Sequence, residues 1–246
     1  MQSAPEVPTM SDRQREQSPQ TSARPGWFGS GARPLRVLLL RHGQTPMSVA
    51  GVFSGRSDPE LTALGHAQAE RAASWLRVRQ DAGEGIDAVY TSPLVRARQT
   101  ADAVAEELGI EPVTTPDLIE TDFGVWEGLE FDEVHRRWPT EHADWAADPS
   151  VSAVGGESMD AVAARCGRLI GSLERSGGDG GTWQGRTVLL VSHVSPIKAI
   201  LRTALEAPAT VYSTLHLDLA GLSVAEFYPD RSVVREVNDT HYLQGL

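Results

Sequence analysis

The sequence LRVLLLRHGQT, residues Leu35–Thr45, is the stretch that decides the fold. Its first six residues are mostly apolar and have the length of a buried strand rather than a helix. The strand ends in Arg41, His42 and Gly43, at the edge where open α/β sheets bind their ligands. Arg41 offers a planar fork of donors for a phosphate or carboxylate. An unprotonated His42 offers a ring nitrogen that can attack an electrophile.

Two further segments repeat this pattern of a short strand followed by a helix. Asp87–Ser92 precedes Pro93, which suits the first turn of a helix, and Arg96 falls in that turn. Arg186–Ser192 is the clearest apolar run and leads directly into His193. Strand–helix units favour an α/β fold with a parallel sheet and helices on both faces. We therefore expect two arginines and two histidines to meet at one edge of the sheet.

The rest of the pattern gives a coarse map of elements. It predicts helices at Ala63–Arg79, Phe131–Trp138, Thr140–Ala147, Met159–Arg175 and Ile197–Leu205, and strands at Glu111–Thr115, Leu215–Leu219, Ser223–Tyr228 and Val233–Val237. Thr62 is the expected N-cap of the first helix, whose core-facing stripe includes Leu64 and Val78. Pro46–Pro59 and Ser172–Gly185 are expected to be loops.

The segment Asp117–Gly128 mixes acidic, aromatic and glycine residues in a way that a plain connector does not. Its available carboxylates are Glu120, Asp122 and Glu127. The two short helices that follow are expected to cap the site as a lid. His135 and His142 lie on these helices and are expected to be solvated.

Composition limits the class of protein. The 246 residues carry a formal net charge of −11, which argues against nucleic acid as a partner. Cys166 is the one cysteine, so no intramolecular disulfide forms, as in a protein of a reducing compartment. No apolar run approaches the length of a membrane span, and the first thirty residues lack the apolar core of a signal peptide. We expect a cytoplasmic protein without a membrane partner.

The amino-terminal segment differs from the rest of the chain. Residues 1–34 are rich in Ser, Gln, Pro and Arg, with few aliphatic residues and no periodicity. We expect a disordered tail there and one domain over residues 35–246. Two alternatives are a docking tail around Trp27 and Phe28, and a start of the chain at Met10.

Two arginines and two histidines suit a phosphoryl group and make a poor metal site, because arginine does not ligate metals. One histidine would attack and the other would donate to a phosphoryl oxygen, with no metal or cofactor. A carboxyl group must then protonate the leaving alkoxide, and Glu120 is preferred to Asp122 for this role. Ser54 and Gly55 are expected to face the same ligand, and the role of Arg56 is left open.

Five motifs together resemble the histidine phosphatase (phosphoglycerate mutase-like) superfamily. They are LLRHGQT at 39–45, SPLVRARQTA at 92–101, ETDFGVWEG at 120–128, GES at 156–158 and VSH at 191–193. The resemblance implies a three-layer α/β/α sandwich with a mostly parallel sheet. It also implies phosphorylation of His42, a phosphate pocket of Arg41, Arg96 and His193, and Glu120 as proton donor.

Within the superfamily, the motifs RHGQTP, ETDFGVWEGL and VNDT are most similar to the acid phosphatase half of bacterial ribonuclease H/acid phosphatase fusions. The chain also resembles α-ribazole phosphatases. Cofactor-dependent mutases usually carry an asparagine where this chain has Ser48, and a longer, arginine-rich insertion where it has Leu129–Val154.

These features predict a metal-independent phosphoric monoester hydrolase of the histidine acid phosphatase type, acting on a small-molecule phosphomonoester. The alternatives are phosphoglycerate mutase-type transfer and a non-catalytic binding module. The sequence leaves open the identity of the substrate and the formation of a homodimer.

Overall fold

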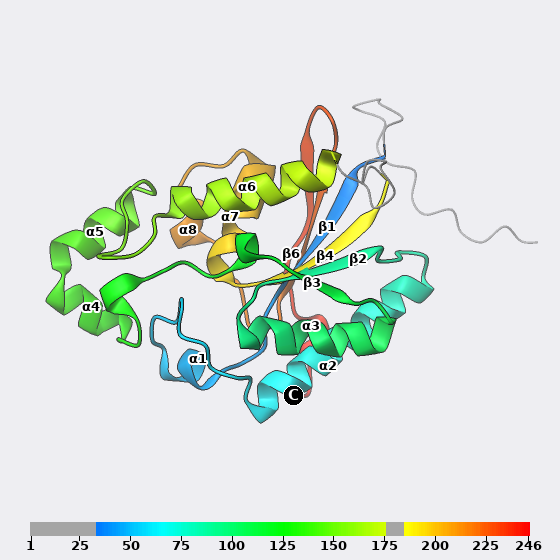
Figure 1. Cartoon of the computed structure of the whole chain (residues 1–246), viewed down its shortest axis with the longest axis horizontal. Helices are drawn as coiled ribbons and strands as arrows, with labels where there is room; N and C mark the ends of the chain where they lie inside the picture. Colours follow the sequence, from blue (N-terminus) through cyan, green and yellow to red (C-terminus); the bar gives the residue numbers. More distant parts are fainter. Residues whose placement is uncertain (1–32, 176–184) are drawn as a thin grey trace, which may run out of the picture. The chain divides into compact units, whose positions relative to one another are not determined.

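A six-stranded sheet forms the centre of the computed structural model, which describes residues 33–175 and 185–246 (Figure 1). Its strands are β1 (Leu35–Arg41), β2 (Ala88–Thr91), β3 (Pro112–Thr114), β4 (Thr187–Ser192), β5 (Leu222–Phe227) and β6 (Ser232–Asp239). The strand order is β3-β2-β4-β1-β5-β6. The first four strands in this order run parallel, and β5 lies antiparallel to both β1 and β6. The predicted α/β fold with a mostly parallel sheet is confirmed.

Helices cover both faces of the sheet (Figure 1). The helices α2 (Ala63–Asp81) and α3 (Val95–Leu108) pack on one face, and α6 (Met159–Arg175) and α7 (Val194–Leu205) pack on the other. Shorter elements are α1 (Pro46–Ala50), α4 (Phe131–Arg137), α5 (Pro139–Ala147), α8 (Val211–Thr214) and the 3-10 turns η1 (Pro116–Leu118), η2 (Gly124–Trp126) and η3 (His241–Leu243). Within the described ranges, none of the helices has both the length and the apolar character needed to cross a membrane.

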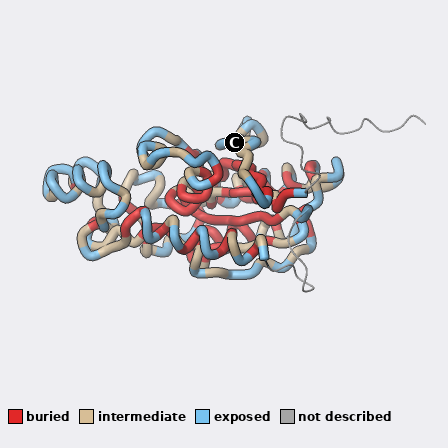
Figure 2. Tube along the Cα trace, turned by 90° about the horizontal axis from the view of Figure 1, so that it is seen from above, coloured by how far each residue is buried: buried red, intermediate tan, exposed pale blue. Residues whose placement is uncertain are grey.

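The central strand β1 contributes side chains to both cores, which explains its continuous apolar sequence. Leu35, Val37 and Leu39 pack with α6 and α7, whereas Leu38 and Leu40 pack with α2 and α3. The buried residues therefore run through the middle of the fold (Figure 2). The α4–α5 hairpin has Val134 as its one buried residue and lies outside this core.

Two parts of the predicted map are wrong. Leu215–Leu219 alternates like a strand but forms none, because the amide of Asp218 binds the Asn238 side chain and its carbonyl accepts from Gly221 in a turn. The loop predicted after β1 contains α1, which begins with a capping box between Thr45 and Ser48. Residues 1–32 of the predicted tail and residues 176–184 of the predicted Gly-rich loop lie outside the described residues, whereas 172–175 belong to α6.

The core-facing side of α2 also differs from the prediction. Ala69, Ala72 and Leu76 are buried, whereas Leu64 and Val78 are 38% and 56% exposed. Next to Val78, the buried Arg79 pairs with Glu84 and Glu236. The buried face of α2 is predicted wrongly when only apolar residues are considered, because an arginine that is paired with carboxylates can also point into the core.

Leu76→Ala and Leu64→Ala test which face of α2 is buried. The two changes have the same effect on helix propensity, so their difference reports burial. We expect Leu76→Ala to lower the free energy of unfolding by about 2–5 kcal/mol, and Leu64→Ala by about 0.5 kcal/mol. Urea unfolding followed by circular dichroism measures both, and equal losses would contradict the observed packing.

Candidate active site

The predicted cluster forms where three strands end. Arg41 is the last residue of β1 and His42 follows it, Arg96 lies in the first turn of α3, and His193 is the N-cap of α7. The rings of His42 and His193 lie with their centroids 5.0 Å apart. Glu120, between η1 and η2, is buried and lines the same cavity as Arg41, His42 and Arg96. The structure therefore brings together the five residues that the sequence assigns to catalysis.

One hydrogen bond sets the protonation pattern of His42. Its Nδ1 lies 2.7 Å from the carbonyl oxygen of Gly43. Because a carbonyl oxygen only accepts, this contact places the proton on Nδ1 and leaves the lone pair on Nε2. Burial, reinforced by Arg41 and Arg96, holds the pKa of His42 well below its usual range. His42 is therefore a neutral imidazole with an available nucleophilic nitrogen.

His193 is fully buried next to the ring of His42. Its Nε2 lies 2.7 Å from the hydroxyl oxygen of Ser92, at the end of the neighbouring strand. Its Nδ1 is also buried and has no hydrogen-bond partner among the described residues. Burial, followed by the charge of Arg96, keeps the pKa of His193 well below its usual range. His193 thus retains a ring nitrogen that a ligand can use.

Arg96 is almost fully buried, and backbone carbonyls hold it in place. Its guanidinium donates to the carbonyl oxygens of Ser57 at 2.7 Å, Ser54 at 3.0 Å and Gly55 at 3.1 Å. The predicted ligand contacts need revision here. Ser54 lines the cavity, whereas the backbone groups of Gly55 are bonded to Arg96 and Glu127. A Cβ at position 55 would collide with the carbonyl of Thr121, so this glycine permits a close backbone approach.

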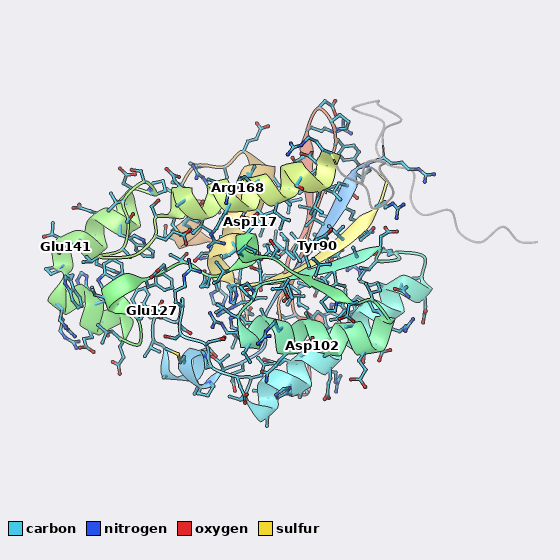
Figure 3. The ribbon with its side chains drawn as sticks, in the orientation of Figure 1. Tyr90, Asp102, Asp117, Glu127, Glu141 and Arg168 are labelled. Carbon is cyan, nitrogen blue, oxygen red and sulfur yellow. The ribbon has the colours of Figure 1, made fainter. Side chains whose placement is uncertain are left out.

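Glu127 fixes the loop that holds Arg96, which is a role that sequence reasoning missed. Its carboxylate accepts the backbone N–H groups of Gly55, Arg56 and Ser57, and also the hydroxyl of Ser57. Figure 3 labels this side chain on the segment that leads into α4. A carboxylate that accepts several N–H groups is a strong anchor. The only sequence signal was its place in the acidic, glycine-containing segment.

Arg41 is the second guanidinium of the site. Its Nη1 donates to the carbonyl oxygen of Leu217 at 2.7 Å, and burial lowers its pKa to about 10. Within residues 33–175 and 185–246, no carboxylate oxygen lies within 4.0 Å of the nitrogens of Arg41 or Arg96. The same residues contain no group of three or more His, Cys, Asp or Glu that could hold a metal ion. Two guanidinium groups held by neutral carbonyls suit a dianionic ligand, with Glu120 as the main opposing charge that acts on both of them.

The two candidate proton donors have different surroundings. Glu120 faces the cavity, and its Oε1 accepts the N–H of Thr121 at 2.7 Å. The carboxylate of Asp122 instead accepts the N–H of Gly124 and lies 3.6 Å from the guanidinium of Arg56. Neither Asp122 nor Arg56 lines the cavity. The location of Glu120 in the cavity therefore favours it as the proton donor. Arg56 pairs with Asp122 outside the cavity, which indicates a structural role.

The site opens into a cavity of about 810 Å³ with residues that the sequence analysis did not select. They include Lys198, Tyr212, Phe53, Phe123, Phe131 and Trp145. Lys198 donates to the carbonyl oxygen of Tyr212 at 2.8 Å. It is the only lysine in the chain, and this was the feature of the sequence that could have marked it as a functional residue. His142 was expected to be solvated, yet it is half-buried and lines the cavity, whereas His135 is exposed. The aromatic side chains gave no signal because apolar residues usually belong to a core.

The fold and the site define a class of α/β proteins with a histidine and arginine cluster at the carboxyl edge of the sheet. Residues 37–240 match the profile of the histidine phosphatase superfamily (branch 1), and the chain belongs to this superfamily.

Known proteins share this architecture. The chain is 47% identical over 225 residues to a protein of Mycobacterium tuberculosis named as bifunctional, covering 89% of this chain and 58% of that one. It thus spans little more than half the length of this relative. A mycobacterial glucosyl-3-phosphoglycerate phosphatase superposes with a TM-score of 0.73 at 30% identity, over 84% of this chain and 99% of that one. An alpha-ribazole phosphatase from Shigella flexneri superposes with a TM-score of 0.70 at 25% identity, over 83% and 96%.

The two buried imidazoles predict a pH dependence of stability. Their pKa values lie below the ordinary 6.5, so below that pH the unfolded chain binds more protons than the folded one. Stability should therefore fall as the pH drops from 6.5, by up to about 1.4 kcal/mol per pH unit for each imidazole. His193→Asn should have a shallower slope between pH 6.5 and 5 in urea unfolding without phosphate. An unchanged slope would show that the folded His193 titrates normally.

Proposed function

We propose that the protein is a metal-independent phosphomonoesterase that works through a phosphohistidine on His42. The observation that carries this proposal is the protonation pattern of His42. The Nδ1 proton is bound to Gly43, and Nε2 keeps its lone pair in a pocket with Arg41 and Arg96. Membership in the histidine phosphatase superfamily supports the same reaction class.

The first half of the reaction transfers the phosphoryl group to the protein. Arg41 and Arg96 bind the phosphate oxygens, and Nε2 of His42 forms a bond to phosphorus while the ester P–O bond breaks. Because the transferring group carries negative charge on its equatorial oxygens, fixed guanidinium groups stabilise it without a metal. The leaving oxygen takes a proton from Glu120, which lines the cavity together with Arg41, His42 and Arg96.

The second half releases the phosphate. The Glu120 carboxylate takes a proton from a water molecule, whose oxygen attacks phosphorus while the P–N bond breaks. The electron pair returns to Nε2, and the Nδ1 proton stays bound to the carbonyl of Gly43 throughout. The Nδ1 of His193, which has no partner among the described residues, would donate to a phosphoryl oxygen in both steps.

His42→Ala tests the nucleophile. It should lower phosphate release from phosphomonoesters, measured with EDTA present, by about a thousandfold or more, because no other group replaces the attacking nitrogen. His66→Ala, which removes an exposed histidine of α2, is the control and should keep full activity. Rapid quenching should give an acid-labile, base-stable phosphoryl group on the peptide that contains His42.

The same experiment separates the rival functions. Full activity of His42→Ala would overturn the phosphohistidine mechanism. Labelled phosphate that moves between positions of a phosphoglycerate, instead of appearing free, would indicate a mutase. A folded wild-type protein that releases no phosphate from any ester would indicate a binding module.

Glu120→Gln tests the proton donor, with Asp122→Asn as its matched control. Loss of the acid should slow phosphoenzyme formation from an alkyl phosphate by about 10²–10⁴-fold, because a poor leaving group needs a proton. Formation from p-nitrophenyl phosphate, whose leaving group needs none, should change only a few-fold, so a burst of nitrophenolate precedes slow turnover. Rapid-mixing measurements of the first turnover decide the point. The reverse pattern, with Asp122→Asn selectively slow on alkyl esters, would assign the role to Asp122.

A further inference from the structure

The cavity has two kinds of lining. The phosphate-binding part contains Arg41, His42, Arg96 and Glu120, as described above. The lining also includes four aromatic side chains, which we name the aromatic wall: Phe53, Phe123, Phe131 and Trp145. A cavity of about 810 Å³ is much larger than a phosphate group needs and lies in the range that accepts a whole organic ligand. The wall therefore faces the part of the substrate that leaves.

The aromatic wall is a packed cluster and not a set of separate side chains. The ring centroid of Phe53 lies 4.7 Å from that of Phe131 and 4.9 Å from that of Phe123, in edge-to-face arrangements. Trp145 lies edge-on to Phe123, with centroids 6.1 Å apart. These geometries are the favoured ones for aromatic pairs, so the wall is held in a fixed shape.

Phe131 is the informative member of the wall. Phe131 is the first residue of α4. It is 55% exposed, although its ring contacts that of Phe53 and it lines the cavity. A large aromatic ring left partly in water at a cavity is the kind of surface that a ligand covers. The three other rings are more buried, and the ring of Phe53 contacts that of Phe131.

We propose that the leaving group of the substrate carries an aromatic ring that packs against the aromatic wall. This proposal rests on the function proposed above and names the substrate class for the same site. A ring in the leaving group would cover Phe131 and bury apolar surface on both partners. A small polar leaving group would leave the half-exposed ring of Phe131 in water.

The competing class is a small leaving group that carries a carboxylate. Its binding group would be Lys198, which donates to Tyr212 and lines the cavity from α7. Burial and the charge of Arg41 lower the pKa of Lys198, so an anion must compete with nearby positive charge to use it. Among the described residues, Lys198 is the one cationic side chain that the cavity lining offers besides Arg41 and Arg96, and it is already bonded to Tyr212, whereas the wall presents the half-exposed ring of Phe131, which favours the aromatic class.

The test compares two alkyl esters whose leaving alcohols have similar acidity, 2-phenylethyl phosphate and n-propyl phosphate. The full chain should have a kcat/KM for the phenylethyl ester about tenfold or more above that for the propyl ester. Phe131→Ala should lower this ratio by about tenfold, mainly through the KM of the phenylethyl ester. Val125→Ala is the matched control, because Val125 is 50% exposed on the neighbouring η2 and does not line the cavity.

A binding measurement keeps the test independent of turnover. Calorimetry with 2-phenylethylphosphonate and n-propylphosphonate, which resist hydrolysis, should give the same preference and the same loss in Phe131→Ala. If no ester is hydrolysed, the proposed function fails while the phosphonates still test the wall. Equal affinities for the two phosphonates would overturn the aromatic class. A preference for O-phosphoserine over both esters that Lys198→Met removes would establish the carboxylate class instead.

Discussion

The burial of two guanidinium groups without carboxylate partners is the constraint on which this structure depends. Carbonyl oxygens of a loop hold Arg96 and that of Leu217 holds Arg41, whereas the Nε atom of each arginine is buried without a hydrogen-bond partner among the described residues. Burying such charges is costly unless fixed dipoles surround them. The fold therefore supplies a rigid loop, and Glu127 holds that loop through its N–H groups. An anionic ligand is the one partner that completes this arrangement electrostatically.

Burial, reinforced by these positive charges, determines the protonation state of the histidines. Two imidazoles beside buried cations and away from water are neutral, and the carbonyl of Gly43 selects the tautomer of His42. A neutral imidazole can attack phosphorus, whereas an imidazolium cannot. One electrostatic arrangement thus attracts the phosphate and keeps the attacking nitrogen available. In the proposed mechanism, the arginines would therefore help to keep the imidazole neutral before any ligand arrives and would bind the phosphate afterwards.

The sequence predicted the parts of the site that depend on side-chain identity at strand ends. Parallel strands share one edge, so Arg41, Arg96 and His193 could be placed together before any coordinates were known. The anchors of the arginines could not be predicted, because any residue can supply a carbonyl and nothing in the sequence distinguishes that of Leu217. The turn at Leu215–Leu219 was mistaken for a strand for a related reason, since its partner Asn238 is twenty residues from Asp218 in sequence. Long-range contacts of the backbone are the information that local patterns lack.

The two kinds of cavity lining are built by different parts of the fold. The phosphate-binding part comes from strand ends and first helical turns, which the hydrogen bonds of the sheet hold in register. The rest of the lining comes from the loops that carry Phe53 and Phe123 and from α4, α5 and α8, three helices that contribute few buried residues. A change in those segments alters the shape of the cavity at little cost to the core, whereas a change at the strand ends disturbs the core and the chemistry together. Under the proposed function, this separation would let one phosphate site accept different leaving groups, with the helices outside the sheet selecting among them.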